Sequence, residues 1–297
     1  MEQPDVTVVG VTGNALPWLE QCLDSVRGRD VVVVDHGSTD GTLDLVRERF
    51  PDVRIVEQEN LGFGGGNNRG IAETDAPWVL LLNSDAWFAD DDGLARLLAF
   101  AAERPDAAVV GPRLRNTDGS LQRSVRGFPT LWGLATEYLF LRKLRPGSRL
   151  LNPLYAGGFD HESVREADYL YGACLLVRRA AVEEVGGLDE DFFMFSEETE
   201  WCYRFRQAGW SVVFAPVADV VHVGGASHGG KLFRENVRGH LRFLAKHRGV
   251  AYAERARRLL RVALRLRGAL YRGERGAQYR DAARWLGSGD VPRLLER

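Results

Sequence analysis

Short hydrophobic runs rich in β-branched residues alternate with helical patterns in the first part of the chain. The runs contain no regular polar positions, which is typical of strands buried on both faces of a sheet. They cover residues 6–11, 31–34, 53–56, 78–82 and 107–110. Strands that alternate with helices predict an α/β fold in which a mostly parallel sheet is flanked by helices.

Polar residues follow directly after four of these runs. In a parallel sheet, ligands bind beyond the carboxyl ends of the strands, so these residues are the first candidates for a functional site. They are Thr12–Asn14, Asp35–Ser38, Glu57–Asn60 and Asn83–Asp85.

The pattern becomes irregular between residues 113 and 166, where glycine, proline, arginine and aromatic residues are mixed. We expect an insertion here that shapes a substrate cleft. Regular patterns then return, with a strand-like stretch at 169–177, helices at 179–185 and 197–208, and strands at 212–214 and 220–223. These elements complete a predicted main domain of residues 1–230.

The remaining residues, 231–297, form a basic extension. They carry 18 Lys and Arg against 6 Asp and Glu, although the whole chain has a formal net charge of -2. From Tyr252 to Leu270 the apolar residues follow helical spacing with arginines on the opposite side, which predicts an amphipathic basic helix. Such a helix either packs on the main domain or lies on an anionic membrane surface, and both interpretations stay open.

Composition narrows the class of protein. The nearly balanced charge argues against a general nucleic-acid binder, and we expect no nucleic-acid partner. Three distant cysteines cannot build a disulfide framework, which favours a reducing compartment. The sequence shows no signal peptide, and no uninterrupted apolar stretch approaches the length of ~18 residues that a membrane span needs. We therefore expect a cytoplasmic protein, free or at the inner face of the cell membrane, of open oligomeric state.

Asn83, Ser84 and Asp85 come directly after a very apolar run. Mg²⁺ or Mn²⁺ needs few protein oxygens when a substrate diphosphate supplies the others, so one well-placed aspartate suffices. The alternative is an ordinary Asx turn at the end of a strand.

Asp35 and a glycine-rich stretch at 60–70 suggest a nucleotide site. Asp35 could accept hydrogen bonds from a nucleobase or ribose, or it could cap the next helix, although Ser38 and Asp40 already suit that role. The glycines would allow a loop to approach a ligand closely, or would form a tight structural turn. Arg69 beside them could pair with a phosphate.

An acidic cluster follows an aromatic run further along the chain. Glu197, Glu198 and Glu200 repel one another, and one that points into an apolar cleft would have a raised pKa suited to a general base. The alternative is favourable electrostatics at a helix N-terminus. His222 ends a predicted strand, from which a neutral imidazole could complete a metal site or serve a structural role.

Together these segments resemble the inverting glycosyltransferases of family 2, which have the GT-A fold, and especially the rhamnosyltransferase-like and galactofuranosyltransferase-like branch. Five pieces match in order over about residues 5 to 225. They are VTGN at 11–14, VVVVDHGSTDGT at 31–42, NLGFGGGNNRGI at 60–71, LLLNSDA at 80–86 and GGLDEDFFMFSEETEWCYRFRQAGW at 186–210.

The resemblance implies a Rossmann-like GT-A domain with a basic helical extension, and a role for each matched residue. Thr12 and Asp35 would hold the nucleoside, and Arg69 would lie near the nucleotide. Asn83, Ser84 and Asp85 would form the variant D-x-D motif in which Asp85 binds the cation. His222 would contribute to the metal site, and the Glu197–Glu198 pair would supply the base, with Glu198 as our choice. The sequence departs from the family at Gly13, His36 and Glu198, where an aromatic residue, Asn and Asp are common.

The implied activity is transfer of a sugar from a nucleotide-diphosphate donor to a hydroxyl group of a saccharide or polyprenyl-linked acceptor, in the synthesis of cell-envelope polysaccharide. The cation would neutralise charge on the leaving diphosphate, and the carboxylate would take the proton of the acceptor. Single displacement needs no protein nucleophile and inverts the anomeric carbon.

Two other functions compete with this one. A nucleotide-cofactor oxidoreductase would use Gly10, Gly13 and Asp35, but the G-x-G-x-x-G fingerprint is incomplete and the acidic cluster would have no role. A catalytically inactive sugar-binding scaffold would keep the fold and lose the acids, whereas Asp85 and Glu198 are present.

Overall fold

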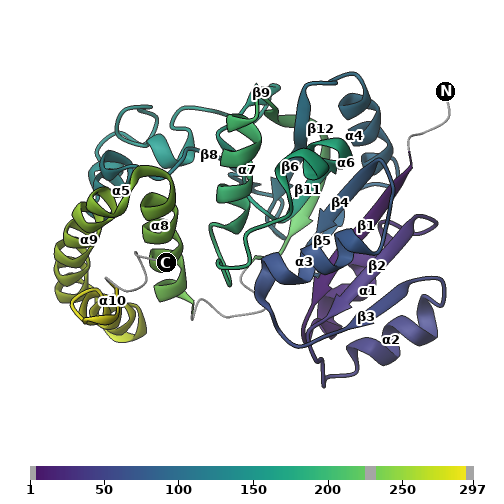
Figure 1. Ribbon diagram of the computed structural model, residues 1–297, viewed down its shortest axis with the longest axis horizontal. Coiled ribbons are helices and arrows are strands. Elements are labelled where there is room, and N and C mark those ends of the chain that lie inside the picture. The colour runs from purple at the N-terminus through teal and green to yellow at the C-terminus, as the bar shows by residue number, and fades with distance from the viewer. Residues whose placement is uncertain (1–4, 225–231, 292–297) are drawn as a thin grey trace. The chain divides into compact units, whose positions relative to one another are not determined.

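The computed structural model describes residues 5–224 and 232–291. These residues form two compact units (Figure 1). The first unit contains 5–125, 160–193 and 197–224, and the second contains 126–159, 194–196 and 232–291. Each unit is described by itself.

The first unit is built on one large sheet with the strand order β3-β2-β1-β4-β11-β6-β12-β5. Strands β1 to β4 run parallel, β12 runs parallel to β6, and β11 is antiparallel to β4 and β6. The strands are β1 (Val6–Thr12), β2 (Asp30–Asp35), β3 (Arg54–Glu57), β4 (Trp78–Leu82), β5 (Ala86–Phe88), β6 (Ala107–Arg115), β7 (Leu121–Gln122), β9 (Arg165–Glu166), β11 (Cys174–Arg178) and β12 (Ser211–His222). The short strands β8 (Val125–Arg126) and β10 (Tyr169–Leu170) lie outside this sheet.

Helices cover both faces of the sheet, as the alternation of side chains along β1 shows. Val6 and Val8 belong to one core cluster with residues of α1 and α4, whereas Val9 and Val11 contact α3 on the other face. The helices are α1 (Leu16–Asp24), α2 (Thr42–Arg49), α3 (Gly62–Ala72), α4 (Gly93–Ala102), α6 (Arg179–Val185) and α7 (Glu197–Gln207). The predicted α/β fold with a mostly parallel sheet flanked by helices is confirmed.

Most of the glycine-rich stretch is helical, whereas we expected either a loop that approaches a ligand closely or a tight structural turn. It lies inside α3, and a Cβ on Gly66 or Gly70 would come within 2.7 Å of Val11 or 2.3 Å of Val9. The glycines therefore allow the helix to pack directly on β1. Since Gly66 faces Val11 and Gly70 faces Val9, α3 runs back along the strand, away from its carboxyl end.

Strand β12 also differs from the prediction. We expected two strands at 212–214 and 220–223, but one strand extends from Ser211 to His222 and changes its register with β6 between Phe214 and Asp219. The irregularity allows a single strand to continue across the break in its hydrophobic pattern.

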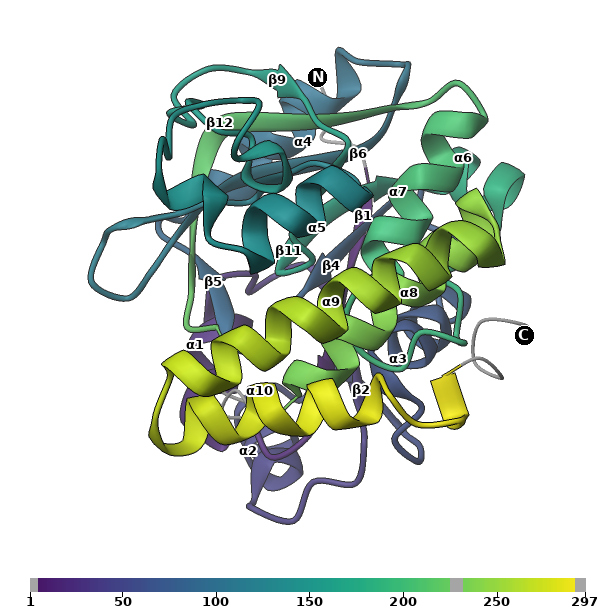
Figure 2. The same cartoon turned by 90° about the vertical axis from the view of Figure 1, so that its left-hand side faces the viewer.

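The second unit is a small helical body. Helix α9 packs against α5, α8 and α10, and Figure 2 shows α9 and α10 side by side. Its elements are α5 (Leu131–Tyr138), η1 (Leu141–Lys143), η2 (Pro153–Tyr155), α8 (Phe233–Arg248), α9 (Val250–Leu270) and α10 (Gly273–Trp285). Residues 126–159, which we had expected within a cleft-forming insertion, therefore belong with the basic extension.

The predicted basic helix exists as α9, but its apolar residues divide between two faces. Ala256, Leu260 and Ala263 are buried, whereas Leu266 and Leu270 are 53% and 71% exposed. None of the helices in residues 5–224 and 232–291 combines the length and the apolar character needed to span a bilayer. The boundary predicted at residue 230 lies outside the described residues, and the division there stays a prediction.

Candidate active site

The carboxyl ends of the parallel strands bring several predicted site residues to one edge of the sheet. Thr12 of β1 is in register with Asp35 of β2, and Asp35 with Glu57 of β3. Strand β4, which is parallel to β1, ends at the same edge before Asn83.

Asp85 and His222 lie together at this edge. Their side chains are 6% and 2% exposed, and Asp85 Oδ1 is 3.3 Å from His222 Nε2. The second carboxylate oxygen accepts a hydrogen bond of 3.2 Å from the Gly224 amide, which fixes the carboxylate after β4 against the end of β12. The structure therefore joins two residues that are 137 positions apart in the sequence.

Gln122 determines which nitrogen of His222 is available. His222 Nδ1 donates to Gln122 Oε1 at 2.7 Å, while the Gln122 amide group donates to the Asn116 side chain and the His222 carbonyl. The proton on Nδ1 leaves a lone pair on Nε2, which faces the carboxylate of Asp85 and accepts a long hydrogen bond of 3.4 Å from the Asn83 side-chain amide. Two lone-pair donors this close repel each other unless a cation or proton is shared between them.

A divalent cation fits this donor set. Carboxylate oxygen and imidazole nitrogen suit Mn²⁺, and Mg²⁺ takes carboxylate oxygen and water. No group of three or more His, Cys, Asp or Glu is arranged for a metal among the described residues, so a substrate would have to supply the other ligands. Cys22 hydrogen-bonds to the Asn83 carbonyl, but burial and then the charge of Asp85 raise the pKa of its thiol to about 12. Cys22 is therefore a neutral thiol and a poor ligand.

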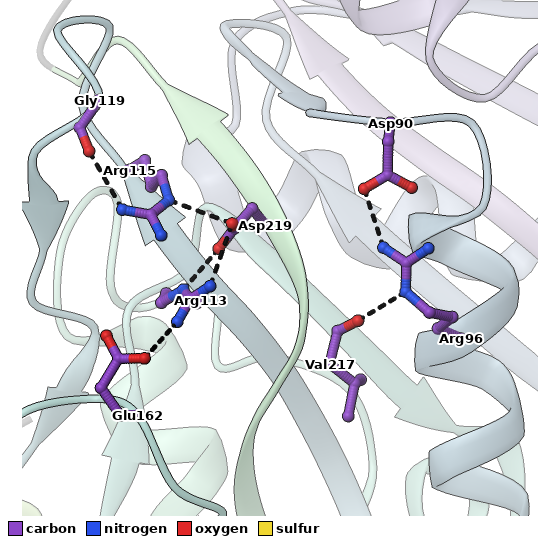
Figure 3. A network of polar contacts seen from close by, with 8 residues as sticks. All are labelled: Asp90, Arg96, Arg113, Arg115, Gly119, Glu162, Val217 and Asp219. Carbon is purple, nitrogen blue, oxygen red and sulfur yellow. Dashed lines mark hydrogen bonds and ion pairs between the residues drawn. The ribbon is translucent and has the colours of Figure 1, made fainter.

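A network of ion pairs holds the part of β12 that leads to His222 (Figure 3). Asp219 accepts from Arg113 Nε at 2.5 Å and pairs with Arg115 Nε at 3.1 Å, both on β6. Arg113 also pairs with Glu162 at 2.8 Å. Although partial burial opposes it, hydrogen bonding from the two arginines keeps the pKa of Asp219 below its ordinary value. The strand is thus anchored three residues before His222.

The three glutamates at the start of α7 have different environments. Glu200 is fully buried and pairs with Arg204 Nε at 2.8 Å, so its charge is neutralised within the helix. Glu197 is 4% exposed, and its Oε2 has no hydrogen-bond partner in the part of the chain that the structure describes. Burial and then the charge of Glu198 raise the pKa of Glu197 well above its ordinary value. The shift favours a proton on Glu197 and the negative charge of the pair on Glu198.

A short segment between β10 and β11 links the acidic pair to the Asp85–His222 pair. The Tyr171 ring lies 5.7 Å from the His222 ring, and the Ala173 carbonyl accepts the Asn83 amide at 3.0 Å. Between them, a Cβ on Gly172 would lie 3.6 Å from the Glu198 side chain. The segment 171–173 therefore contacts both halves of the site.

Thr12 and Asp35 lie side by side, as predicted, but Asp35 has structural partners. Its carboxylate accepts the Gly37 and Ser38 amides and the Ser38 hydroxyl, which fixes the loop after β2. Thr12 is buried, and its hydroxyl has no partner among the described residues. A free buried hydroxyl beside a carboxylate is suited to recognise a polar ligand.

Arg69 does not join this group. It lies in the last turn of α3, is 53% exposed and pairs with Glu73 at 2.7 Å. Because α3 runs away from the carboxyl edge of the sheet, the structure does not bring Arg69 to the other candidates, and its expected contact with a nucleotide is without support here.

Sequence reasoning missed Gln122, Tyr171 and Asp219. Gln122 lies in the irregular stretch where no periodic pattern exists, and Tyr171 falls inside what looked like one continuous strand. Only the spacing of Asp219 three residues before His222 could have suggested a positioning role.

A family model described as "Glycosyl transferase family 2" matches residues 7–186. The chain belongs to this family. It is therefore a glycosyltransferase, which sets aside the oxidoreductase. The matched residues include Thr12, Asp35 and Asp85, whereas Glu198 and His222 lie beyond them.

Two relatives of this glycosyltransferase are rhamnosyltransferases. The N-acetylglucosaminyl-diphospho-decaprenol L-rhamnosyltransferase of Mycobacterium tuberculosis is 35% identical over 72% of this chain and 75% of its own length. Rhamnosyltransferase WbbL of Escherichia coli is 26% identical over 82% of this chain and 94% of its own. The resemblance to the rhamnosyltransferase-like branch is thereby confirmed.

Solved structures show the same fold. The mannosyltransferase PcManGT from Pyrobaculum calidifontis in complex with GDP-Man and Mn²⁺ has a TM-score of 0.57 and 18% identity, and the match covers 100% of this chain and 86% of that one. TarS 1-349 of S. aureus in complex with UDP-GlcNAc has a TM-score of 0.55 and 16% identity. The match covers 98% of this chain and 83% of that one. The predicted GT-A fold is confirmed.

Proposed function

We propose that this glycosyltransferase moves a sugar from a nucleotide-diphosphate donor to an acceptor hydroxyl with inversion at the anomeric carbon. The observation that carries the proposal is the pair of metal-ligand atoms, Asp85 Oδ1 and His222 Nε2, 3.3 Å apart at the carboxyl edge of the sheet. The segment 171–173 connects this pair to the glutamate that bears the charge of the acidic pair.

Asp85 and His222 would hold a divalent cation, either Mg²⁺ or Mn²⁺. When bound, such a cation supplies Lewis-acid stabilisation of the leaving diphosphate. Gln122 keeps the His222 proton on Nδ1, and the Gly224 amide orients Asp85, so both ligand atoms are fixed before the substrate arrives. Mn²⁺ in the solved mannosyltransferase complex supports this assignment.

Glu198 would be the general base that takes the proton of the acceptor hydroxyl. It bears the negative charge because Glu197, buried and without a hydrogen-bond partner for its Oε2 among the described residues, keeps a proton. Glu200 is excluded from this role by its ion pair with Arg204. The reaction is then a single displacement in which no residue of the protein becomes covalently linked to the sugar.

Thr12 and Asp35 would contact the nucleoside of the donor. The unpartnered Thr12 hydroxyl is free to bond with the ligand, and Asp35 both shapes the adjoining loop and leaves carboxylate lone pairs for a ribose or base. Arg69 has no part in this proposal.

We further propose that the acceptor is polyprenyl-linked and that the enzyme acts at the inner face of the cell membrane. The M. tuberculosis relative, by its name, acts on a diphospho-decaprenol-linked sugar. In this chain, α9 exposes Val262, Leu266 and Leu270 on the same side as the arginines Arg258 and Arg265. A helix that exposes both apolar and cationic side chains is suited to lie on the surface of an anionic membrane.

A thermal-shift panel of UDP-, TDP- and GDP-sugars with Mn²⁺ or Mg²⁺ tests the donor assignment. We expect one nucleotide sugar to raise the unfolding temperature only when a divalent cation is present, since a ligand that binds only the folded state stabilises it. Stabilisation that is equal with and without metal would contradict the role of Asp85 and His222.

A further inference from the structure

The second unit contains a hollow with an unusual excess of positive charge. It is a shallow hollow of about 40 Å³, open to solvent, and lies where the end of α5, η1 and the α9–α10 turn meet. Four cationic side chains line it, Arg142, Lys143, Arg267 and Arg275, against one carboxylate, Glu137. Glu137 contacts Arg142 and lies 3.5 Å from Arg267 Nη2, so it can neutralise only part of this charge.

The two remaining cations form no ion pair within the described residues, although the charge of Glu137 also acts on Arg275. Lys143 Nζ lies 4.9 Å from the centre of the Phe140 ring, and Arg275 Nε donates to the Tyr279 hydroxyl at 3.1 Å. Neither contact neutralises a charge. Cations that are gathered around a hollow without counter-charges favour an anionic ligand there.

Arg267 makes the hollow a built site. It is only 6% exposed, its Nε donates to the Tyr138 carbonyl at 2.8 Å, and its guanidinium lies 4.4 Å from the centre of the Phe140 ring. These contacts, together with hydrogen bonds from its Nη atoms to the Glu137 carbonyl and the Tyr279 hydroxyl, hold the guanidinium in one orientation, so Arg267 supplies a fixed positive charge to the hollow. A role in this hollow would explain why α9 buries Arg267 at a position where its hydrophobic pattern calls for an apolar residue.

Exposed leucines flank the same hollow. Leu144, directly after Lys143, is 77% exposed, and Leu270, directly before Tyr271, is 71% exposed. The two segments meet through the stacked rings of Phe140 and Tyr271, 6.1 Å apart. An anion site beside exposed apolar side chains suits an amphiphile, because the polar group and the hydrocarbon chain can be bound together.

We propose that this hollow binds the diphosphate group of a lipid, with the hydrocarbon chain along Leu144 and Leu270. The inference rests on the proposed polyprenyl-linked acceptor and adds a binding site for it in the second unit. A diphosphate that links a prenyl chain to a sugar bears two negative charges, which match Lys143 and Arg275, whereas a phospholipid phosphodiester bears one. The ligand is therefore the lipid-linked acceptor and not bulk anionic lipid.

The test measures partition of the full chain, without metal, onto two sets of vesicles of equal surface charge. One set is phosphatidylcholine with a polyprenyl diphosphate linked to N-acetylglucosamine, which bears the two charges of the proposed ligand, and the other is phosphatidylcholine with phosphatidylglycerol. We expect the wild-type chain to prefer the diphosphate vesicles about tenfold, which corresponds to one charge-assisted hydrogen bond. The double variant Lys143→Gln/Arg275→Gln should lose this preference.

A matched control removes two exposed charges of α9 away from the hollow. Arg255→Gln/Arg258→Gln should weaken binding to both vesicle sets and keep the preference. If the double variant of the hollow unfolds, the single variant Lys143→Glu at an exposed position gives the same test. Equal preference in wild-type and hollow variants, or no wild-type preference, would overturn the proposal.

The proposed function is tested separately by the wild-type thermal shift with nucleotide sugars. If the wild-type chain binds a donor but shows no preference for the diphosphate, only the hollow is refuted. If it binds no donor, the proposed function fails whatever the vesicles show.

Discussion

At the scale of single residues, the site depends on protons that burial and hydrogen bonds hold in place. Gln122 keeps a proton on His222 Nδ1 and so exposes Nε2 toward Asp85. Burial and the charge of Glu198 raise the pKa of Glu197, which favours the charge of the acidic pair on Glu198. The sequence could identify the acids and the histidine, but not these protonation states, because they depend on neighbours that are distant along the chain.

His222→Gln tests the metal ligand. We expect the Mn²⁺ concentration needed for half-maximal transfer to rise about 10- to 100-fold, with turnover at saturating Mn²⁺ much less affected, because Asp85 and the donor still bind the cation. Transfer rates over a range of Mn²⁺ concentrations give both quantities. An unchanged metal requirement would show that His222 is not a ligand.

At the scale of elements, hydrophobic patterns were a good guide where strands are buried on both faces. Strand β4 was predicted at its observed bounds, Trp78–Leu82, and β1, β2, β3 and β6 were predicted within a few residues. The glycines of α3 misled us because their role is close packing on Val9 and Val11, a tertiary contact with no local signal. The burial of Arg267 has no local signal either, since it depends on Glu137 and Phe140, which are distant along the chain.

Asp219→Asn tests the anchor of β12. The change removes the charge that Arg113 and Arg115 share, so we expect His222 to be held less firmly and the affinity for Mn²⁺ with donor to fall about tenfold. Calorimetric titration measures the affinity. Asp90→Asn is the matched control, because its pair with Arg96 is exposed and Arg96 reaches β12 through its own hydrogen bond to the Val217 carbonyl (Figure 3). Equal effects of the two variants would argue against a positioning role for Asp219.

At the scale of the whole molecule, the chain combines a GT-A unit with a helical unit that contains a buried histidine. Burial and then the charge of Arg126 lower the pKa of His240 on α8 from 6.5 to about 4. The unfolded chain therefore binds more protons than the folded chain between these values. The stability that the neutral imidazole contributes is complete above about pH 6.5 and is lost as the pH falls toward 4.

His240→Leu should remove this pH dependence. Between pH 7 and pH 5 we expect the wild-type free energy of unfolding to fall by about 2 kcal/mol more than that of the variant, from the difference between the two pKa values. Urea unfolding at both pH values measures it, and the comparison of slopes is independent of any change in overall stability. Parallel pH profiles would show that folding does not lower the pKa of His240.

The central claim is that Glu198 accepts the proton of the acceptor beside a cation held by Asp85 and His222. The most direct measurement is the transfer rate of Glu198→Gln, with Glu197→Gln as the matched control and donor binding checked by thermal shift. We predict a loss of turnover of at least ~100-fold for Glu198→Gln with donor binding retained, and a much smaller loss for Glu197→Gln. Transfer near the wild-type rate by Glu198→Gln, or the larger loss in Glu197→Gln, would contradict it.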